Sequence, residues 1–192
     1  MSIATISIEN LQHSDKTTKV LNESKAKLGF TPNMYLGMAG NTSLIDSYLY
    51  AYDSFRAHSN FTSVEQEVIF LSVSYFNNCE YCTAAHSFIA DKMSGVPTDI
   101  TNAIRSGEEL PDEKLNALSV FTKLMVEKRG WVEQQEVDSF FEAGYNESHL
   151  LGIITAIAVK TMSNYSNHVT KPALDDVFAG RKWTKEELGT TV

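Results

Sequence analysis

Apolar residues recur every three or four positions along most of the chain, which is the spacing of one face of an α-helix. In segment 41–58, Leu44, Tyr48, Tyr52 and Phe55 follow one another at intervals of four, four and three residues. Further helical segments, separated by Gly, Pro or Asn, are expected at 14–29, 31–40, 61–76, 79–94, 98–106, 112–128, 133–143 and 147–169. Alternating strand patterns are almost absent, and the start of the chain, IATISI, is the only weak candidate. We therefore predict an all-α fold.

Two of these segments are apolar around much of their circumference. Segments 61–76 and 147–169 are expected to be central, buried helices for that reason. Segment 61–76 places Ser63 and Gln66 at the spacing of a capping box, and Asn77-Asn78 interrupts the helical pattern after it.

The length and composition fit one compact domain. The chain has 192 residues, of which 43% are hydrophobic, and we expect a core over about 14–178 and a loose tail after about 180. Lys and Arg number 16 and Asp and Glu 24, giving a net charge of −8 with no basic block, so neither nucleic acid nor a membrane surface is an expected partner. We see no secretory signal and no long apolar run, and we expect a cytoplasmic protein.

Both cysteines of the chain lie in one short stretch, NNCEYCTAAH, together with a histidine. At about 100° per residue, a helix that begins near Cys79 would place Cys79, Cys82 and His86 on one stripe. Cys79 would then lie in the first turn, where backbone N–H groups and the helix dipole stabilise a thiolate. His86 could accept the proton of Cys82 or hold its thiolate as an ion pair, and either interaction activates sulfur.

Two thiols at this spacing can also exchange two electrons. Once one sulfur is oxidised to a sulfenic acid, the other can condense with it to a disulfide before irreversible oxidation. Three alternatives compete with this redox centre. The residues could simply pack in the core. They could bind zinc, with His168 or a carboxylate completing the ligand set through the fold. A thioredoxin-like dithiol would need a preceding strand that the pattern does not show.

Two carboxylates precede the cysteines in segment 61–76. Glu65 falls in the first turn, where an acidic residue commonly offsets the helix dipole. Glu67 lies further in, between apolar residues. If it is partly desolvated, its pKa would be raised and it could exchange protons near neutrality; the alternative is a solvated side chain.

The arrangement of Glu67, eleven intervening residues, Cys79-Glu80-Tyr81-Cys82 and His86 resembles the carboxymuconolactone decarboxylase-like superfamily, in its alkylhydroperoxidase AhpD branch. The segments FTPNMYLGMAGNTSLIDSYLYAYDSF, QEVDSFFEAGYNESHLLGIITAIAVKTMSNYSNHV and KPALDDVF are similar to the subgroup of peroxidase-related proteins. Together they cover most of residues 28–178.

The resemblance implies an all-α fold that assembles into homo-oligomers, as trimers or hexamers, and the reduction of small hydroperoxides. It implies that Cys82 is the peroxidatic nucleophile and that Cys79 is the resolving thiol, which forms a Cys79–Cys82 disulfide. Glu67 and His86 would form the proton relay that deprotonates Cys82 and protonates the leaving alcohol. No metal or other cofactor is implied, and an external dithiol would reduce the disulfide.

One position departs from AhpD, which has a histidine between the two cysteines where this chain has Tyr81. A phenol with a pKa of about 10 is a poor base near neutrality but can donate a hydrogen bond.

Further along, Asn164 and His168 lie four residues apart on the last long helix. They are candidates for the pocket or an oligomer contact, and capping near the helix end is the alternative. The aromatic residues of segment 41–58 are interpreted as core or subunit contacts rather than as substrate-binding residues.

Three functions follow, in decreasing order of support. The first is a thiol-dependent peroxidase, and the second is a disulfide oxidoreductase or redox sensor that uses the same dithiol. The third is a structural or metal-clipped oligomer. Superfamily members that act as true decarboxylases generally lack the dithiol, so we do not expect that reaction.

Overall fold

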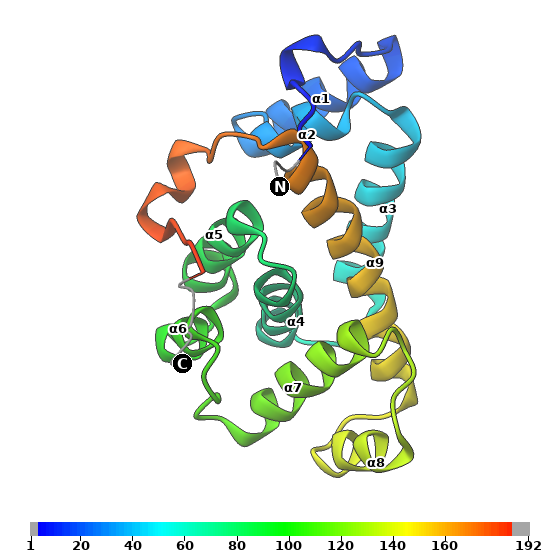
Figure 1. Ribbon diagram of the computed structural model, residues 1–192, viewed down its shortest axis with the longest axis vertical. Helices are drawn as coiled ribbons and strands as arrows, with labels where there is room; N and C mark the ends of the chain where they lie inside the picture. The colour runs from blue at the N-terminus through cyan, green and yellow to red at the C-terminus, as the bar shows by residue number, and fades with distance from the viewer. Residues whose placement is uncertain (1–3, 186–192) are drawn as a thin grey trace.

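The computed structural model describes residues 4–185, and in this range all regular structure is helical, as predicted (Figure 1). Residues 4–7 of the weak strand candidate form no strand. The helices are η1 (Ile8–Asn10), α1 (Asp15–Leu28), α2 (Asn33–Met38), α3 (Thr42–His58), α4 (Ser63–Phe76), α5 (Glu80–Ile89), η2 (Ala90–Ser94), α6 (Thr98–Ser106), α7 (Glu113–Glu127), α8 (Gln134–Glu142), α9 (Glu147–Thr170) and η3 (Asp176–Arg181).

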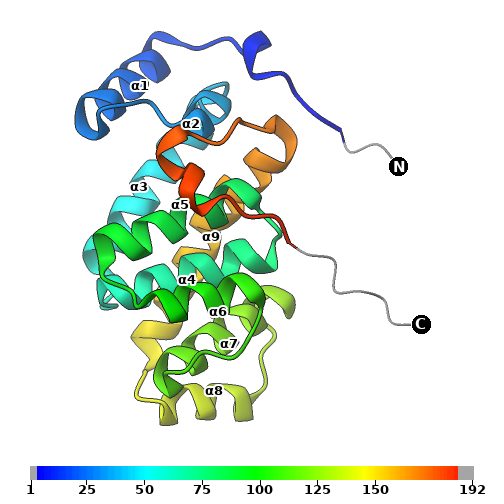
Figure 2. The same ribbon diagram turned by 90° about the vertical axis from the view of Figure 1, so that its left-hand side faces the viewer.

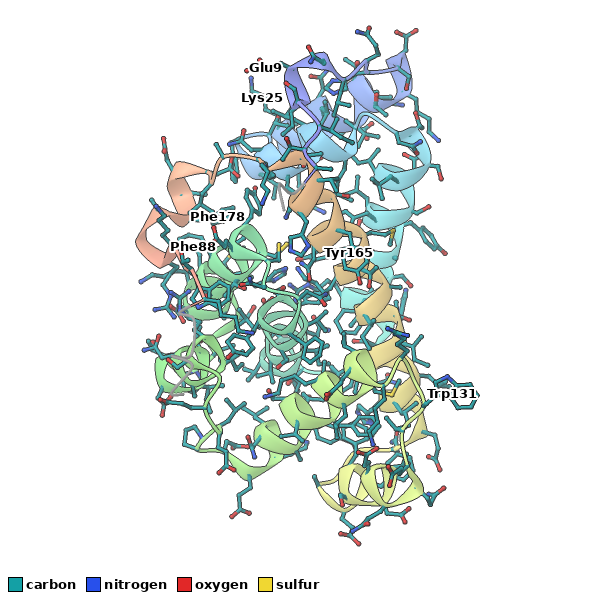
Figure 3. All side chains as sticks on the ribbon, in the orientation of Figure 1. Glu9, Lys25, Phe88, Trp131, Tyr165 and Phe178 are labelled. Atoms are coloured by element: carbon teal, nitrogen blue, oxygen red, sulfur yellow. The ribbon has the colours of Figure 1, made fainter. Side chains whose placement is uncertain are left out.

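Helix α4 is the central element and packs against α5, α6, α7 and α9 (Figures 1 and 2). Val68, Ile69, Phe70 and Leu71 are fully buried, which confirms the prediction of a central helix. Helix α9 differs from the prediction because only one of its faces is buried. Tyr165 points outward from this helix and is 57% exposed (Figure 3).

The capping box of α4 lies one residue earlier than the sequence pattern indicated. The Thr62 hydroxyl accepts a hydrogen bond from the Glu65 N–H, and the Glu65 carboxylate accepts one from the Thr62 N–H. Gln66 cannot serve as the partner because its amide is engaged with backbone carbonyls, including that of Phe61 at 3.0 Å. The expected role of Glu65 at the helix N-terminus is thus confirmed.

The interruption predicted at Asn77-Asn78 is a tight turn that sets α5 against α4. Asn77 caps the end of α4, and Asn78 adopts a left-handed conformation with φ 54°. Asparagine tolerates this conformation better than most residues. The turn brings Cys79 to the N-cap position of α5, so the helix begins one residue later than expected. Past Ile89 the chain continues as a single π-helical turn, η2.

The chain beyond α9 returns across α5 and then to α6. Trp183 is buried, and its indole N–H donates a hydrogen bond to the carbonyl of Arg105 on α6. The Arg105 guanidinium in turn donates to the carbonyls of Arg181 and Lys182. The tail expected to be loose after about residue 180 is therefore held as far as Trp183, and its residues 186–192 lie outside the described part. Between residues 4 and 185, no helix combines the length and apolar character needed to cross a membrane.

Candidate active site

A buried carboxylate links three helices at the centre of the molecule. Glu67 of α4 is completely buried, and its Oε2 lies 2.8 Å from Nδ1 of His86 on α5. Its Oε1 accepts a hydrogen bond from the guanidinium of Arg56 on α3. Arg56 also donates to the hydroxyl of Tyr52 at 2.9 Å. The predicted pair of Glu67 and His86 is thus in direct contact, and Arg56 is an unpredicted third member.

These contacts fix the charges of Glu67 and His86. Burial raises the pKa of Glu67, but His86 and Arg56 outweigh it, so the pKa is lowered and the group is a carboxylate. The raised pKa of Glu67 expected from the sequence is therefore wrong, because the sequence did not show that Arg56 lies beside Glu67. Burial and the Lys160 ammonium lower the pKa of His86, which is neutral near pH 7. A carboxylate at Nδ1 assigns the imidazole proton to that atom, and Nε2 can then accept a proton.

The two thiols lie at the start of α5 and share one hydrogen-bond donor. The side-chain amide of Asn167 on α9 donates to the Cys82 sulfur at 3.3 Å and to the Cys79 sulfur at 3.6 Å. Both thiols are free and buried. Cys82 lies in the first turn of α5, one helical turn before His86. The structure therefore places the predicted dithiol and imidazole together with an amide that positions both sulfurs.

The two thiols differ in acidity. Burial raises the pKa of Cys82, but hydrogen bonding from Cys79 and the Lys160 ammonium outweigh it and hold this pKa well below its usual range. Hydrogen bonding to Cys82, followed by burial, raises the pKa of Cys79. The expectation that the helix dipole would favour a thiolate at Cys79 is therefore wrong, and Cys82 is the thiol that loses its proton more readily.

Lys160 of α9 is a buried residue of the candidate site that the sequence analysis did not identify. It is only 1% exposed, and residues 4–185 offer its ammonium no hydrogen-bond acceptor. The ammonium lies 5.5 Å from the centroid of the Phe70 ring. A buried cation without such a partner is costly unless an anion lies nearby. Lys160 is among the groups that lower the pKa of Cys82, so the Cys82 sulfur can supply that charge once it is deprotonated.

A periodic signal on the last long helix could have revealed this residue. Lys160, Ser163, Asn164 and Asn167 follow at i, i+3, i+4 and i+7 in a helix that is otherwise mostly apolar, and all four are buried. Of the two residues predicted on this helix, Asn164 accepts a hydrogen bond from the Asn77 amide at 3.0 Å, so it secures the turn before α5. His168 lies beside Tyr165 with ring centroids 6.2 Å apart.

Tyr81, predicted as a possible hydrogen-bond donor to the relay, donates its hydroxyl to Asp175 instead. Burial and Asp175 raise its pKa, so the phenol keeps its proton. Asp175 also accepts from the backbone N–H of Asn33, at 3.2 Å, at the start of α2. Tyr81 therefore joins α5 to α2 and to the segment that follows α9.

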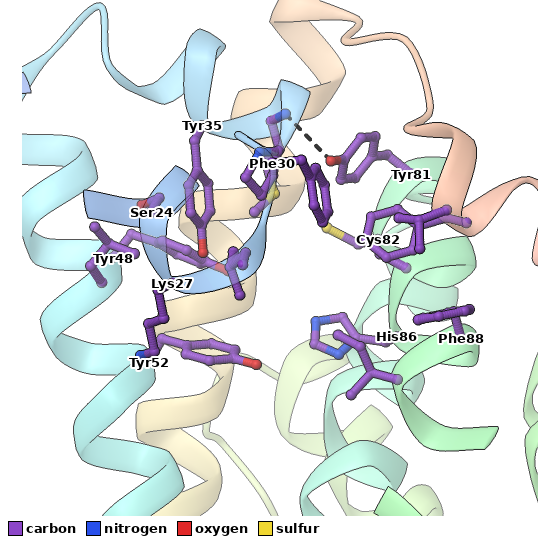
Figure 4. A pocket seen from close by; sticks show the side chains of 18 of the residues that line it. Ser24, Lys27, Phe30, Tyr35, Tyr48, Tyr52, Tyr81, Cys82, His86 and Phe88 are labelled. Atoms are coloured by element: carbon purple, nitrogen blue, oxygen red, sulfur yellow. Dashed lines mark hydrogen bonds between the residues drawn. The ribbon is translucent and has the colours of Figure 1, made fainter. Parts of the chain in front are cut away.

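A cavity of about 590 Å³ opens beside Cys82 and His86, and we call it the first cavity. Figure 4 shows Cys82 and His86 on one side of it and Tyr35, Tyr48 and Tyr52 on the other. Tyr48 and Phe55 belong to the buried core and Tyr52 packs against it, as predicted, and Tyr48 and Tyr52 also line this cavity. The aromatic residues that line the cavity include Phe30, Tyr35, Tyr48, Tyr52, Phe88 and Phe178. Such a surface suits a small, largely apolar substrate.

A second cavity of about 470 Å³ opens beside Cys79. Its lining includes Asn167, His168 and Trp183. His168, a predicted pocket residue, therefore belongs to the cavity of Cys79. Asn164 lines neither cavity.

The zinc alternative gains no support from the geometry. No group of three or more His, Cys, Asp or Glu side chains within residues 4–185 is arranged to hold a metal ion. His168 in particular does not join Cys79, Cys82 and His86 in such a group. A structural zinc site normally has four protein ligands.

Comparison with solved structures identifies the fold as that of the alkylhydroperoxidase AhpD core, as predicted. An uncharacterized, peroxidase-related AhpD-core protein from Ralstonia eutropha JMP134 has a TM-score of 0.79 at 20% identity, over 93% of this chain and 95% of that one. A peroxidase-related protein from Silicibacter sp. TM1040 has a TM-score of 0.76 at 20% identity, over 94% and 96%. A variant of the debrominase Bmp8 with one substitution, in complex with 2,3,4-tribromopyrrole, has a TM-score of 0.68 at 16% identity, over 94% and 95%. No protein-family profile matches the chain, and no curated protein matches its sequence.

Proposed function

We propose that this protein is a thiol peroxidase that reduces small organic hydroperoxides with Cys82 as nucleophile and Cys79 as resolving thiol. One observation carries the proposal. The more acidic sulfur, that of Cys82, lines an aromatic cavity together with a neutral imidazole that is held by a buried carboxylate. A low-pKa thiol beside a base is the arrangement of an activated nucleophile.

The first step consumes the peroxide. Nε2 of His86 takes the proton of Cys82, and the thiolate attacks the nearer peroxide oxygen. The O–O bond breaks, and the alcohol oxygen leaves with the proton from His86 while Cys82 becomes a sulfenic acid. Glu67 holds the imidazole through Nδ1 and stabilises it while it is charged. Lys160 stabilises the thiolate before the attack.

The second step protects Cys82 from further oxidation. The sulfur of Cys79 attacks the sulfenic sulfur, water leaves, and the Cys79–Cys82 disulfide forms. The Asn167 amide favours this step because it donates to both sulfurs and so keeps them near one another. An external thiol or dithiol then returns both residues to thiols. Two of the structural neighbours are described as peroxidase-related, which agrees with this class of reaction.

The test is a single-turnover titration of the reduced protein with cumene hydroperoxide. We expect one peroxide to consume two thiols per chain and to yield one cumyl alcohol. The Cys82→Ser variant should lose the reaction, and Cys79→Ser should give a sulfenic acid that dimedone traps. Circular dichroism checks that both variants fold. Unchanged thiol content in the wild type, or full turnover by Cys82→Ser, would reject the proposal.

A second candidate is reductive removal of bromine from a small aromatic ring. The aromatic lining of the first cavity favours it, and Bmp8, which shares the fold, is a debrominase. The dithiol would supply the same two electrons: Cys82 takes the halogen, a proton replaces it on the ring, and Cys79 displaces bromide to form the disulfide. Incubation of the reduced protein with 2,3,4-tribromopyrrole, with bromide measured against thiol loss, separates the two. Bromide release without peroxide consumption would favour this candidate.

A further inference from the structure

The two sulfurs of the dithiol face different cavities. Cys82 lines the first cavity and not the second, and Cys79 lines the second and not the first. Tyr81, which stands between them in the sequence, lines both, and its hydroxyl is fixed by Asp175. Tyr81 therefore belongs to a wall between the cavities, and a molecule that reaches one sulfur does not need to pass the other.

The second cavity carries polar groups that could receive a ligand. Asn167 is 5% exposed, and its side-chain oxygen has no hydrogen-bond partner within residues 4–185 although its amide nitrogen contacts both sulfurs. The charged residues that line this cavity are Lys171, Lys182 and Glu80, a net charge of +1. Those that line the first cavity are Lys27, Glu23 and Asp53, a net charge of −1. The two cavities thus favour ligands of different charge.

The two sulfurs also differ in how readily a reductant attacks them when they form a disulfide. A thiolate that attacks one sulfur of a disulfide expels the other, and the thiol of lower pKa is the better leaving group. Cys82 is the more acidic thiol of the pair. Attack at Cys79, with Cys82 as the leaving thiolate, is therefore the faster route. Lys160, the ammonium buried near Cys82, stabilises the thiolate that leaves.

We propose that the second cavity is the entry site for the reductant, a small thiol that carries a carboxylate, and that this thiol attacks Cys79 while the oxidising substrate reaches Cys82 from the first cavity. The inference rests on the proposed dithiol cycle. The incoming thiolate forms a mixed disulfide with Cys79 as the Cys79–Cys82 bond breaks, and Cys82 leaves as a thiolate. A second thiol then attacks the sulfur of the first, which releases the reductant as a disulfide and returns Cys79 to a protonated thiol. Two thiols are oxidised, and one protein disulfide is reduced.

The experiment measures the reduction step alone. The wild-type disulfide is formed with diamide, the reagent is removed, and reduction is followed with 3-mercaptopropionate, 2-mercaptoethanol and cysteamine, which are anionic, neutral and cationic. Rates are compared per thiolate. The variant is Lys182→Glu, whose backbone carbonyl keeps its contact with Arg105, and the matched control is Lys92→Glu, an exposed lysine that lines neither cavity.

We expect Lys182→Glu to slow reduction by 3-mercaptopropionate about fivefold and to speed reduction by cysteamine. The rate of reduction by 2-mercaptoethanol should change by less than about twofold, and Lys92→Glu should change none of the three rates. Acid quenching and peptide mapping should find the mixed disulfide on Cys79. Equal effects of the two variants, no effect of Lys182→Glu, or a mixed disulfide on Cys82 would overturn the proposal. Because diamide forms the disulfide without any peroxide, a failure of the peroxidase titration leaves this test readable.

Discussion

The two ends of helix α9 lie in regions that bury different kinds of side chain. Near its start, Phe121, Phe140 and Tyr145 form a stack in which successive ring centroids are 4.3 and 4.6 Å apart. Towards its end, α9 faces α4 and α5, and the buried groups there include the ionisable residues Glu67, His86 and Lys160. The aromatic stack buries rings and has the Lys114 ammonium only at its margin, 4.8 Å from the centroid of the Tyr145 ring, whereas the site buries ionisable groups at its centre.

The difference indicates where the free energy of folding comes from. Burial of aromatic rings stabilises the fold, with an additional gain from ring–ring contacts. A buried ammonium without a hydrogen-bond acceptor costs stability. Lys160 is therefore explained by its effect on Cys82 rather than by the fold.

The largest expected effect is on the stack. Phe140→Ala should lower the free energy of unfolding by about 3–5 kcal/mol, because it removes a fully buried ring and leaves a cavity. Denaturant unfolding measures the loss, and Phe140→Leu, which keeps most of the volume, should lose clearly less. In the protein that remains folded, the pH dependence of Cys82 alkylation should be unchanged. A different pH profile would show that the two regions are coupled.

The second prediction concerns Lys160→Met, which should lower the reactivity of Cys82 without lowering the stability of the protein. At pH 6 a thiol with a pKa of about 8.5 is only about 0.3% thiolate, so a lowered pKa makes Cys82 more reactive than an ordinary thiol at every pH below that value. Lys160→Met removes a charge that lowers this pKa. The midpoint of Cys82 alkylation, followed by mass spectrometry, should therefore rise by about one to two pH units, and the rate at a pH below both midpoints should fall about 10- to 100-fold.

The control for Lys160→Met is Lys160→Arg, which keeps a positive charge and should keep more of the low-pH reactivity. Because the methionine replaces a buried cation with an apolar side chain, its denaturation midpoint should equal or exceed that of the wild type. If Lys160→Met destabilised the protein and left the Cys82 profile in place, Lys160 would be a structural residue.

The same two regions differ in how much of each a sequence reveals. Cys79, Cys82 and His86 could be predicted together because they lie at the start of one helix and along it, where spacing determines which side chains share a face. Glu67 lies on the preceding helix, and only the family resemblance joined it to them. The central position of α4 followed from its apolar pattern in the same way. Such features depend on local geometry, which the order of residues largely determines.

Arg56, Lys160 and Asn167 could not be placed in this way. They come from α3 and α9, and only the packing of these helices on α4 and α5 brings them to the carboxylate and the sulfurs. The expected pKa direction of Glu67 was wrong for that reason: burial could be anticipated, but the guanidinium that compensates it could not. The two separate cavities likewise arise from the packing of the fold. The sequence did not show that Cys79 and Cys82, only three residues apart, would line different cavities.

The smallest expected effect concerns Tyr81, which lies in the dithiol motif but makes the contacts of a structural residue. Tyr81→Phe removes the hydrogen bond to Asp175 and should lower the free energy of unfolding by about 1 kcal/mol. The rate of peroxide reduction should change less than about threefold, because the hydroxyl is committed to Asp175 and not to the relay. The double variant Tyr81→Phe/Asp175→Asn, set against both single variants, measures the coupling of the pair. A tenfold or larger loss of the rate of peroxide reduction in Tyr81→Phe, with stability unchanged, would contradict this assignment. It would show that the Tyr81 hydroxyl takes part in the proton relay.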